Sequence, residues 1–131
     1  YTLITYYSKT MLQEDATKNE KILNQLKEIM IYIEDHHHES LTVKDLAATF
    51  GYHPDYFSRF FKKHLGLSVI DYIYEIRLNH IEHDLRDPNL LINEIFDRHG
   101  CTNYRVTMRK FKQRFSCTPK QKQKEFLSME Q

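Results

Sequence analysis

The sequence predicts an all-α fold, and three observations support this prediction. Only three glycines and three prolines occur in the 131 residues, which favours helices joined by tight turns. Apolar side chains recur at helical spacing, as in Ile22, Leu26, Ile29 and Ile33. In addition, a segment with two short periodic stretches around a glycine occurs twice.

The repeat predicts two helix-turn-helix subdomains. Three residue pairs, fifty positions apart, carry the strongest match: Arg59 and Arg109, Phe61 and Phe111, Lys62 and Lys112. Upstream, Gly51 corresponds to Gly100, and two short helices around such a glycine turn are the outline of a helix-turn-helix. Two of these units in one small chain indicate a protein that reads two stretches of DNA groove.

Capping and turn residues divide the chain into elements. We interpret residues 1–18 as an N-terminal helical arm or linker remnant and residues 19–127 as the DNA-binding domain. Thr17 and Glu20 match a capping box that starts a helix running to about Asp35, whose apolar stripe suits core packing or, alternatively, dimerisation. The later elements are a first helix-turn-helix at about 42–65, a long central linker helix at about 68–86, a second helix-turn-helix at about 91–115 and a short basic helix from Lys120.

Local signals define the first unit and the linker helix. Thr42 can cap a helix that runs to Phe50, and Pro54 suits the first turn of the next helix. Ser68 can cap the linker helix, whose length of about 27 Å suits two recognition helices held one DNA turn, ~34 Å, apart. The expected inner stripe of this helix is Ile70, Ile73, Ile76 or Arg77, Ile81 and Leu85.

Charge is distributed unevenly along the chain. The net charge is only +1, but residues 98–124 contain nine Lys or Arg and no acid. Such a stretch is either a solvated basic face or, beside a helix-turn-helix repeat, a surface for phosphate. No apolar run reaches the length of a membrane span, no signal peptide is present, and the two cysteines lack metal-ligand spacing, so we expect a reduced, cytoplasmic setting and no membrane partner.

The second helix of the first unit, at about 54–64, presents one polar stripe of Asp55, Ser58, Arg59 and Lys62. Arg59 can donate two hydrogen bonds to guanine O6 and N7, and its alternative role is a surface salt bridge. Ser58 reads bases permissively. Asp55 can accept from cytosine N4, although helix capping is its favoured role.

The matching stripe of the second unit, at about 103–115, contains Arg105, Met108, Arg109 and Lys112. Both arginines are expected base readers, whereas Met108 either touches a thymine methyl group or belongs to the core. Lysines are better suited to phosphate than to bases, because an ammonium is a point charge on a mobile stem. The expected phosphate contacts are Lys44, Lys62, Lys112 and Lys120, together with the capped helix starts at Ser68 and Thr118.

Short motifs in both units and in the linker helix belong together: Asp45-Leu46-Ala47, Gly51-Tyr52, Tyr56-Phe57-Ser58-Arg59, Phe61-Lys62-Lys63, Gly66, Arg77-Leu78, Gly100, Phe111-Lys112 and Thr118-Pro119. Through these motifs the chain shows, from residue 19 to 125, a resemblance to the AraC/XylS-type transcription regulators. The resemblance implies two helix-turn-helix subdomains inserted into successive major grooves of double-stranded DNA. The family's base-contacting positions fall on Asp55, Ser58, Arg59, Tyr104, Arg105, Met108 and Arg109.

The resemblance also implies transcription regulation, either as an activator that contacts RNA polymerase or as a repressor. A sensing or dimerising domain is expected elsewhere in the full-length chain, which agrees with a sequence that begins at Tyr1 without methionine. The alternative function is a helical dimerisation or polymerase-contact module whose second unit has lost base reading. Neither interpretation involves a cofactor.

The second unit departs from the family pattern at four positions, which are Phe96, Cys101, Thr107 and Ser116. Phe96 replaces a small residue and Cys101 an aromatic one, so the two changes can conserve core volume. Thr107 brings a hydroxyl group into an expected core position, which is unfavourable unless the group is hydrogen-bonded.

Other chemistry is weakly supported. His36, His37 and His38 adjoin acidic residues, but adjacent histidines at a helix end have poor geometry for one metal, so we interpret them as solvent-exposed imidazoles and assign no metal site. Cys101 is expected to be a buried small apolar residue, with redox sensing as the alternative. No phosphate-binding glycine loop or nucleophile–base pair is found, so we do not expect an enzyme.

Overall fold

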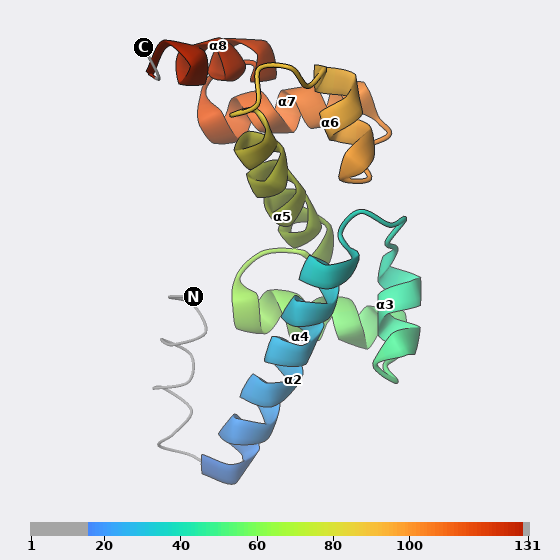
Figure 1. Ribbon diagram of the computed structural model, residues 1–131. Coiled ribbons are helices and arrows are strands. Elements are labelled where there is room, and N and C mark those ends of the chain that lie inside the picture. The colour runs from blue at the N-terminus through green and yellow to red at the C-terminus, as the bar shows by residue number, and fades with distance from the viewer. Residues whose placement is uncertain (1–15, 130–131) are drawn as a thin grey trace. The chain divides into compact units, whose positions relative to one another are not determined.

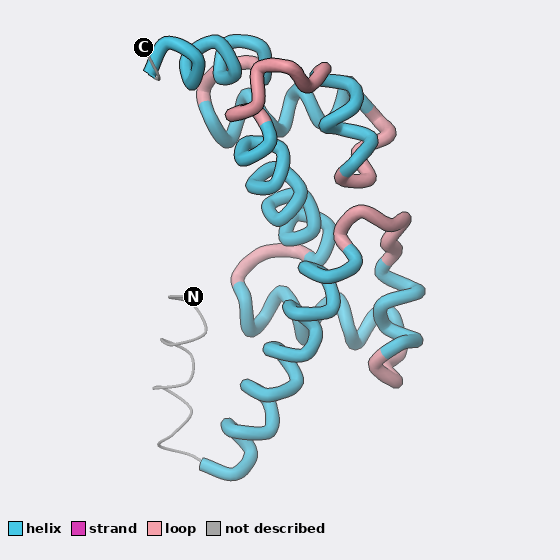
Figure 2. Tube along the Cα trace, viewed as in Figure 1, coloured by secondary structure: helices cyan, strands magenta, loops and turns pink. Residues whose placement is uncertain are grey.

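The computed structural model describes residues 16–129, and this part of the chain is all-α, without strands (Figures 1 and 2). Its helices are α2 (Ala16–His36), α3 (Val43–Thr49), α4 (Pro54–Leu65), α5 (Val69–Asp84), α6 (Ile92–Arg98), α7 (Tyr104–Phe115) and α8 (Pro119–Met129). In the described range, none of them combines the length and hydropathy that a membrane crossing requires.

The chain forms two compact units. The first contains α2, α3, α4 and the first residues of α5 up to Ile73. The second contains residues 37–40 and the chain from Tyr74 onward, and therefore α6, α7 and α8. The predicted arm at residues 1–18 lies almost entirely outside the described residues.

Helix α2 is longer at its start than the sequence indicated. Thr17 is its second residue, so the prediction that Thr17 is the N-cap is wrong. The apolar stripe is confirmed as core at Leu26, Ile29 and Ile33, which are buried, whereas Ile22 is half-buried. Together with Phe57 and Phe61 of α4, these buried side chains form the interior of the first unit.

The first helix-turn-helix has the predicted caps. The Asp45 amide donates to the Thr42 hydroxyl at 3.1 Å, and Gly51 adopts a φ of 76° in the turn. Pro54 begins α4, whose N-cap is His53 rather than Asp55, since Nδ1 of His53 accepts from the Asp55 amide at 3.2 Å.

Helix α5 starts as predicted but buries a different face. The Asp71 amide donates to Ser68 Oγ at 3.1 Å, which confirms the cap. Ile70 was assigned to the inner stripe, yet it is 43% exposed, so this assignment is wrong. Tyr72 and Leu78 are buried instead, because the helix packs in both units and uses more than one apolar face.

The second unit has one continuous core around Phe96, Cys101 and Phe111, which are all buried with residues of α5 and α6. Thr107 is fully buried, and its hydroxyl donates to the Asn103 carbonyl at 2.9 Å. The departure from the family pattern at Thr107 therefore leaves no unsatisfied hydroxyl. At the end of α7, Ser116 adopts a left-handed φ of 62°, which costs more for serine than for glycine.

Segment 37–40 is fixed to the rest of the second unit by two contacts. The buried Arg77 side chain donates to the carbonyl oxygens of His37 at 2.8 Å and Glu39 at 2.7 Å. At Gly100, a Cβ atom would lie 2.8 Å from the carbonyl oxygen of His38. Because glycine has no Cβ atom, residue 100 can adopt a φ of 76° and lie close to the backbone of His38.

Candidate nucleic-acid interface

Helix α4 has a buried aromatic face and an accessible polar face. Phe57, Phe60 and Phe61 are buried in the first unit. Asp55, Arg59 and Lys62 are exposed and Ser58 is half-buried, so the predicted stripe is accessible to a ligand.

The Arg59 side chain can reach outward from this face. Its only hydrogen bond among the described residues is from Nε to the Asp55 carbonyl, at 3.4 Å. No carboxylate in the described range pairs with it, so the salt-bridge alternative is not found. A long contact to a backbone oxygen leaves the planar guanidinium able to form a bidentate pair with a guanine.

Helix α7 exposes the three cationic residues of its predicted stripe, but Met108 is half-buried. Arg105 and Arg109 are exposed, whereas Met108 is half-buried and packs against the core. The Tyr104 hydroxyl donates to Asp97 at 2.6 Å, and this hydrogen bond raises the pKa of Tyr104. The two arginines are therefore the groups of this stripe best placed to meet base edges.

The cations of the second unit fall into two sets. Several have anionic partners, as in Arg114 with Glu75 at 2.9 Å and Arg98 with Asp84 at 3.3 Å. Others are exposed and have no ion-pair partner within residues 16–129: Arg105, Arg109, Lys112, Lys120 and Lys124. The unpaired set contains the three cations of the predicted α7 stripe. These positive charges suit an anionic partner outside the chain.

The remaining predicted phosphate contacts differ in accessibility. Lys44 and Lys62 are exposed in the first unit, and Ser68 and Thr118 are half-buried. The Thr118 amide already donates to Gln121 Oε1 at 2.9 Å, while the Gln121 amide donates to Thr118 Oγ1 at 3.1 Å. This reciprocal cap occupies N–H groups that were expected to meet phosphate.

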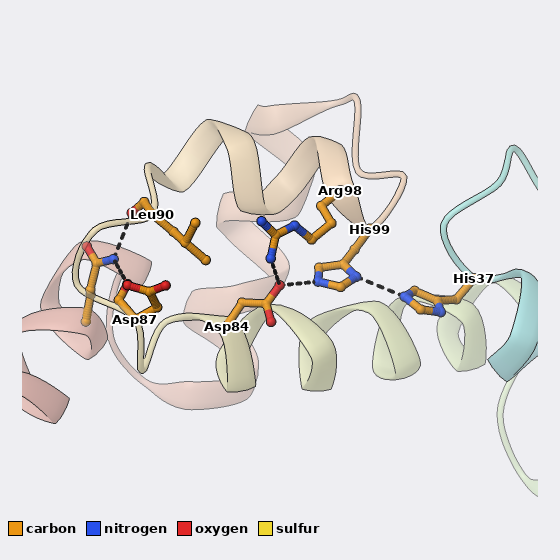
Figure 3. A network of polar contacts seen from close by, with 7 residues as sticks. His37, Asp84, Asp87, Leu90, Arg98 and His99 are labelled. Atoms are coloured by element: carbon orange, nitrogen blue, oxygen red, sulfur yellow. Dashed lines mark hydrogen bonds and ion pairs between the residues drawn. The ribbon is translucent and has the colours of Figure 1, made fainter.

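Sequence reasoning missed a network of imidazoles in the second unit (Figure 3). His37 Nε2 lies 2.9 Å from His99 Nδ1, and His99 Nε2 lies 2.6 Å from Asp84 Oδ2. The interpretation of His37 as solvent-exposed is therefore wrong. Its partners lie far away in the sequence, and no local pattern could have identified them. Burial lowers the pKa of His99, whereas the hydrogen bond to Asp84 and the charge of that carboxylate act in the opposite direction.

Cys101 behaves as the sequence predicted. It is 2% exposed, and burial raises the pKa of its thiol, which disfavours the reactive thiolate. Both cysteines are free thiols.

Comparison with known proteins decides the family. A family described as "Helix-turn-helix domain" matches residues 38–125, which is more than half of the chain. A solved AraC-type regulator from Chromobacterium violaceum has the same fold, with a TM-score of 0.71 at 24% identity over 79% of this chain and 92% of that one. The chain belongs to the AraC-type helix-turn-helix family. Its fold and family are those of DNA-binding transcription regulators.

Two curated relatives show how much of a longer protein this AraC-type chain matches. It is 28% identical over 123 residues to the Msm operon regulatory protein of Streptococcus mutans, covering 94% of this chain and 43% of that protein. It is 33% identical over 94 residues to the transposon Tn10 TetD protein of Escherichia coli, covering 72% of this chain and 68% of that protein. The chain thus spans less than half of the first of these relatives.

The fold is shared with the DNA-binding domain of AdpA, a global transcriptional factor solved in complex with a target DNA. The two structures superpose with a TM-score of 0.74 over 79% of this chain and 94% of that one. Their sequence identity is 19%, so this comparison concerns the fold alone.

Proposed function

We propose that this AraC-type domain regulates transcription by inserting α4 and α7 into successive major grooves of double-stranded DNA. The observation that carries the proposal is the set of exposed cations on the outer faces of these helices that lack ion-pair partners within residues 16–129. The DNA-bound state of a protein with the same fold supports it. Catalysis has no part in this function.

Base reading is divided unequally between the two helices. In α4, Arg59 is the main reader, with Ser58 and Asp55 beside it. In α7, Arg105 and Arg109 carry the reading, because Tyr104 is hydrogen-bonded to Asp97 and Met108 packs on the core. Lys44, Lys62, Lys112 and Lys120 hold the phosphates, together with the helix start at Ser68. The helix start at Thr118 contributes less, because its reciprocal cap with Gln121 already occupies two backbone N–H groups.

The proposal extends to the complete regulator. The curated relatives continue beyond the matched region, so we expect a sensing or dimerising domain in the same polypeptide. We also propose that the protein activates transcription through contact with RNA polymerase. We place it in the cytoplasm, where both thiols stay reduced.

Selection of bound sequences from a random DNA pool tests the function directly. We expect enrichment of a site with two conserved blocks about one helical turn apart. The Arg105→Ala, Arg109→Ala double variant should lose preference in one block and keep it in the other. Enrichment of one block only, unchanged in this double variant, would favour the alternative of a second unit that has lost base reading. A pool without any enrichment would contradict sequence-specific binding.

A further inference from the structure

Three imidazoles from distant parts of the sequence meet in the second unit. His37 belongs to the segment after α2, His80 to α5, and His99 to the turn between α6 and α7. One ring nitrogen of each lies within 4.8 Å of those of the others. The rings of His37 and His80 stack with centroids 4.0 Å apart.

We propose that His37, His80 and His99 bind a divalent transition-metal ion, with Zn²⁺ as the expected occupant. Imidazole nitrogen is a ligand that Zn²⁺ prefers, and three protein ligands with water in the fourth position form a common tetrahedral set. Such a set has metal–nitrogen distances of about 2.0–2.1 Å, which places the nitrogens roughly 3.4 Å apart. Binding requires the stacked rings of His37 and His80 to turn, because parallel rings cannot direct their lone pairs at one ion.

The second contact of His99 orients it for this role. Asp84 Oδ2 lies 2.6 Å from His99 Nε2, and an ionised carboxylate can only accept a hydrogen bond (Figure 3). Nε2 therefore carries a hydrogen, and in the neutral ring the lone pair of Nδ1 points toward His37 Nε2, which is 2.9 Å away. A carboxylate behind a histidine ligand is the arrangement that fixes the tautomer at many metal sites.

The backbone around the three rings is held independently of any ion. Arg77 binds the carbonyl of His37, and Gly100, next to His99, packs against the carbonyl of His38. Two ligands therefore arise from backbone that is already fixed, and a metal needs to order side chains only. A site that is preorganised in this way binds a metal ion more tightly than a loose cluster of surface histidines does.

The test uses the untagged chain, stripped of metal with a chelator and titrated with Zn²⁺ against a chromophoric competitor. We expect one Zn²⁺ per chain and a rise in melting temperature. His80→Ala should weaken binding at least about tenfold and remove the rise. His38→Ala and His83→Ala are matched controls, because both histidines are exposed and lie outside the trio; both variants should bind like the wild type.

Two results would overturn the proposal. One is equal Zn²⁺ binding by the wild type and His80→Ala, which assigns the ion to other histidines. The other is the lack of tetrahedral d–d absorption when Co²⁺ is added to the wild type, a measurement that does not depend on the folding of any variant. DNA binding by the metal-free chain is measured separately, so failure of the metal site leaves the proposed function intact.

Discussion

Arg59 and Lys62 lie on the same face of α4 but suit different parts of DNA. The guanidinium of Arg59 has a planar fork that matches the two acceptors of guanine, whereas the ammonium of Lys62 is a point charge. Both are exposed, so the division of labour that we propose for them rests on side-chain chemistry and not on burial.

Substitutions of Arg59 test base reading at this scale. Arg59→Ala should weaken binding to the selected DNA site by about 1–3 kcal/mol and relax preference at one base position. Arg59→Lys keeps the charge but not the fork, so it should lose the base preference while keeping the salt dependence. Fluorescence anisotropy with matched and single-mismatch duplexes measures both effects. The assignment fails if Arg59→Ala binds all duplexes as the wild type does.

Helical periodicity was sufficient to predict the polar stripe of α4. It was insufficient for α7, where Met108 lies at the border of the core and the Tyr104 hydroxyl is engaged by Asp97. Sequence spacing gives the direction of a side chain but not the partner it finds there. His37 is the extreme case, because two of its ring partners, His80 and His99, lie more than forty residues away in the sequence.

At the scale of elements, the recognition helix of the second unit depends on its N-cap. The Val106 amide donates to Asn103 Oδ1 at 3.2 Å. Asn103→Ala removes this acceptor and should lower the free energy of unfolding by about 0.5–2 kcal/mol, as measured in urea. Thr102→Ala alters the preceding exposed residue, which does not cap α7, and serves as the control. Equal stability of Asn103→Ala and the wild type would show that the cap contributes nothing.

Phe96 and Cys101 share the core of the second unit, and the Cys101 amide donates to the Phe96 carbonyl at 2.9 Å. Phe96→Ala should cost about 3–5 kcal/mol through the cavity it leaves, and Cys101→Phe about 1–3 kcal/mol through overpacking. The double variant should recover much of both losses, because residues in contact are not additive. Purely additive losses in denaturant unfolding would mean that the two side chains do not compensate each other.

Most helix ends were predictable because their signals are local. Thr42, Gly51, Pro54 and Ser68 act as the sequence indicated. The start of α2 was misplaced, since a capping-box pattern also fits residues inside a helix. The buried face of α5 was assigned one stripe, although tertiary packing uses a wider surface that a single-helix pattern does not contain.

At the scale of the whole molecule, the uneven distribution of charge along the chain matters more for DNA binding than the small net charge. The acid-free stretch at residues 98–124 supplies the exposed Lys112 on α7. Lys112→Ala should weaken binding to every DNA sequence about equally and reduce the slope of log K against log salt by roughly one. The control is Lys27→Ala, which removes the same charge from an exposed position on α2 and should leave the slope unchanged. A loss restricted to one sequence, with an unaltered slope, would argue against phosphate contact.

The two turn glycines, although equivalent in the repeat, impose different limits on mutational drift. Gly51 has φ 76° but open space around the position of a Cβ atom, so an asparagine, which tolerates left-handed backbone, has room there. Gly100 has the same φ and a carbonyl oxygen 2.8 Å from that position, so any side chain must displace backbone. We therefore expect the duplicated motif to tolerate asparagine at one copy of its turn and to require glycine at the other.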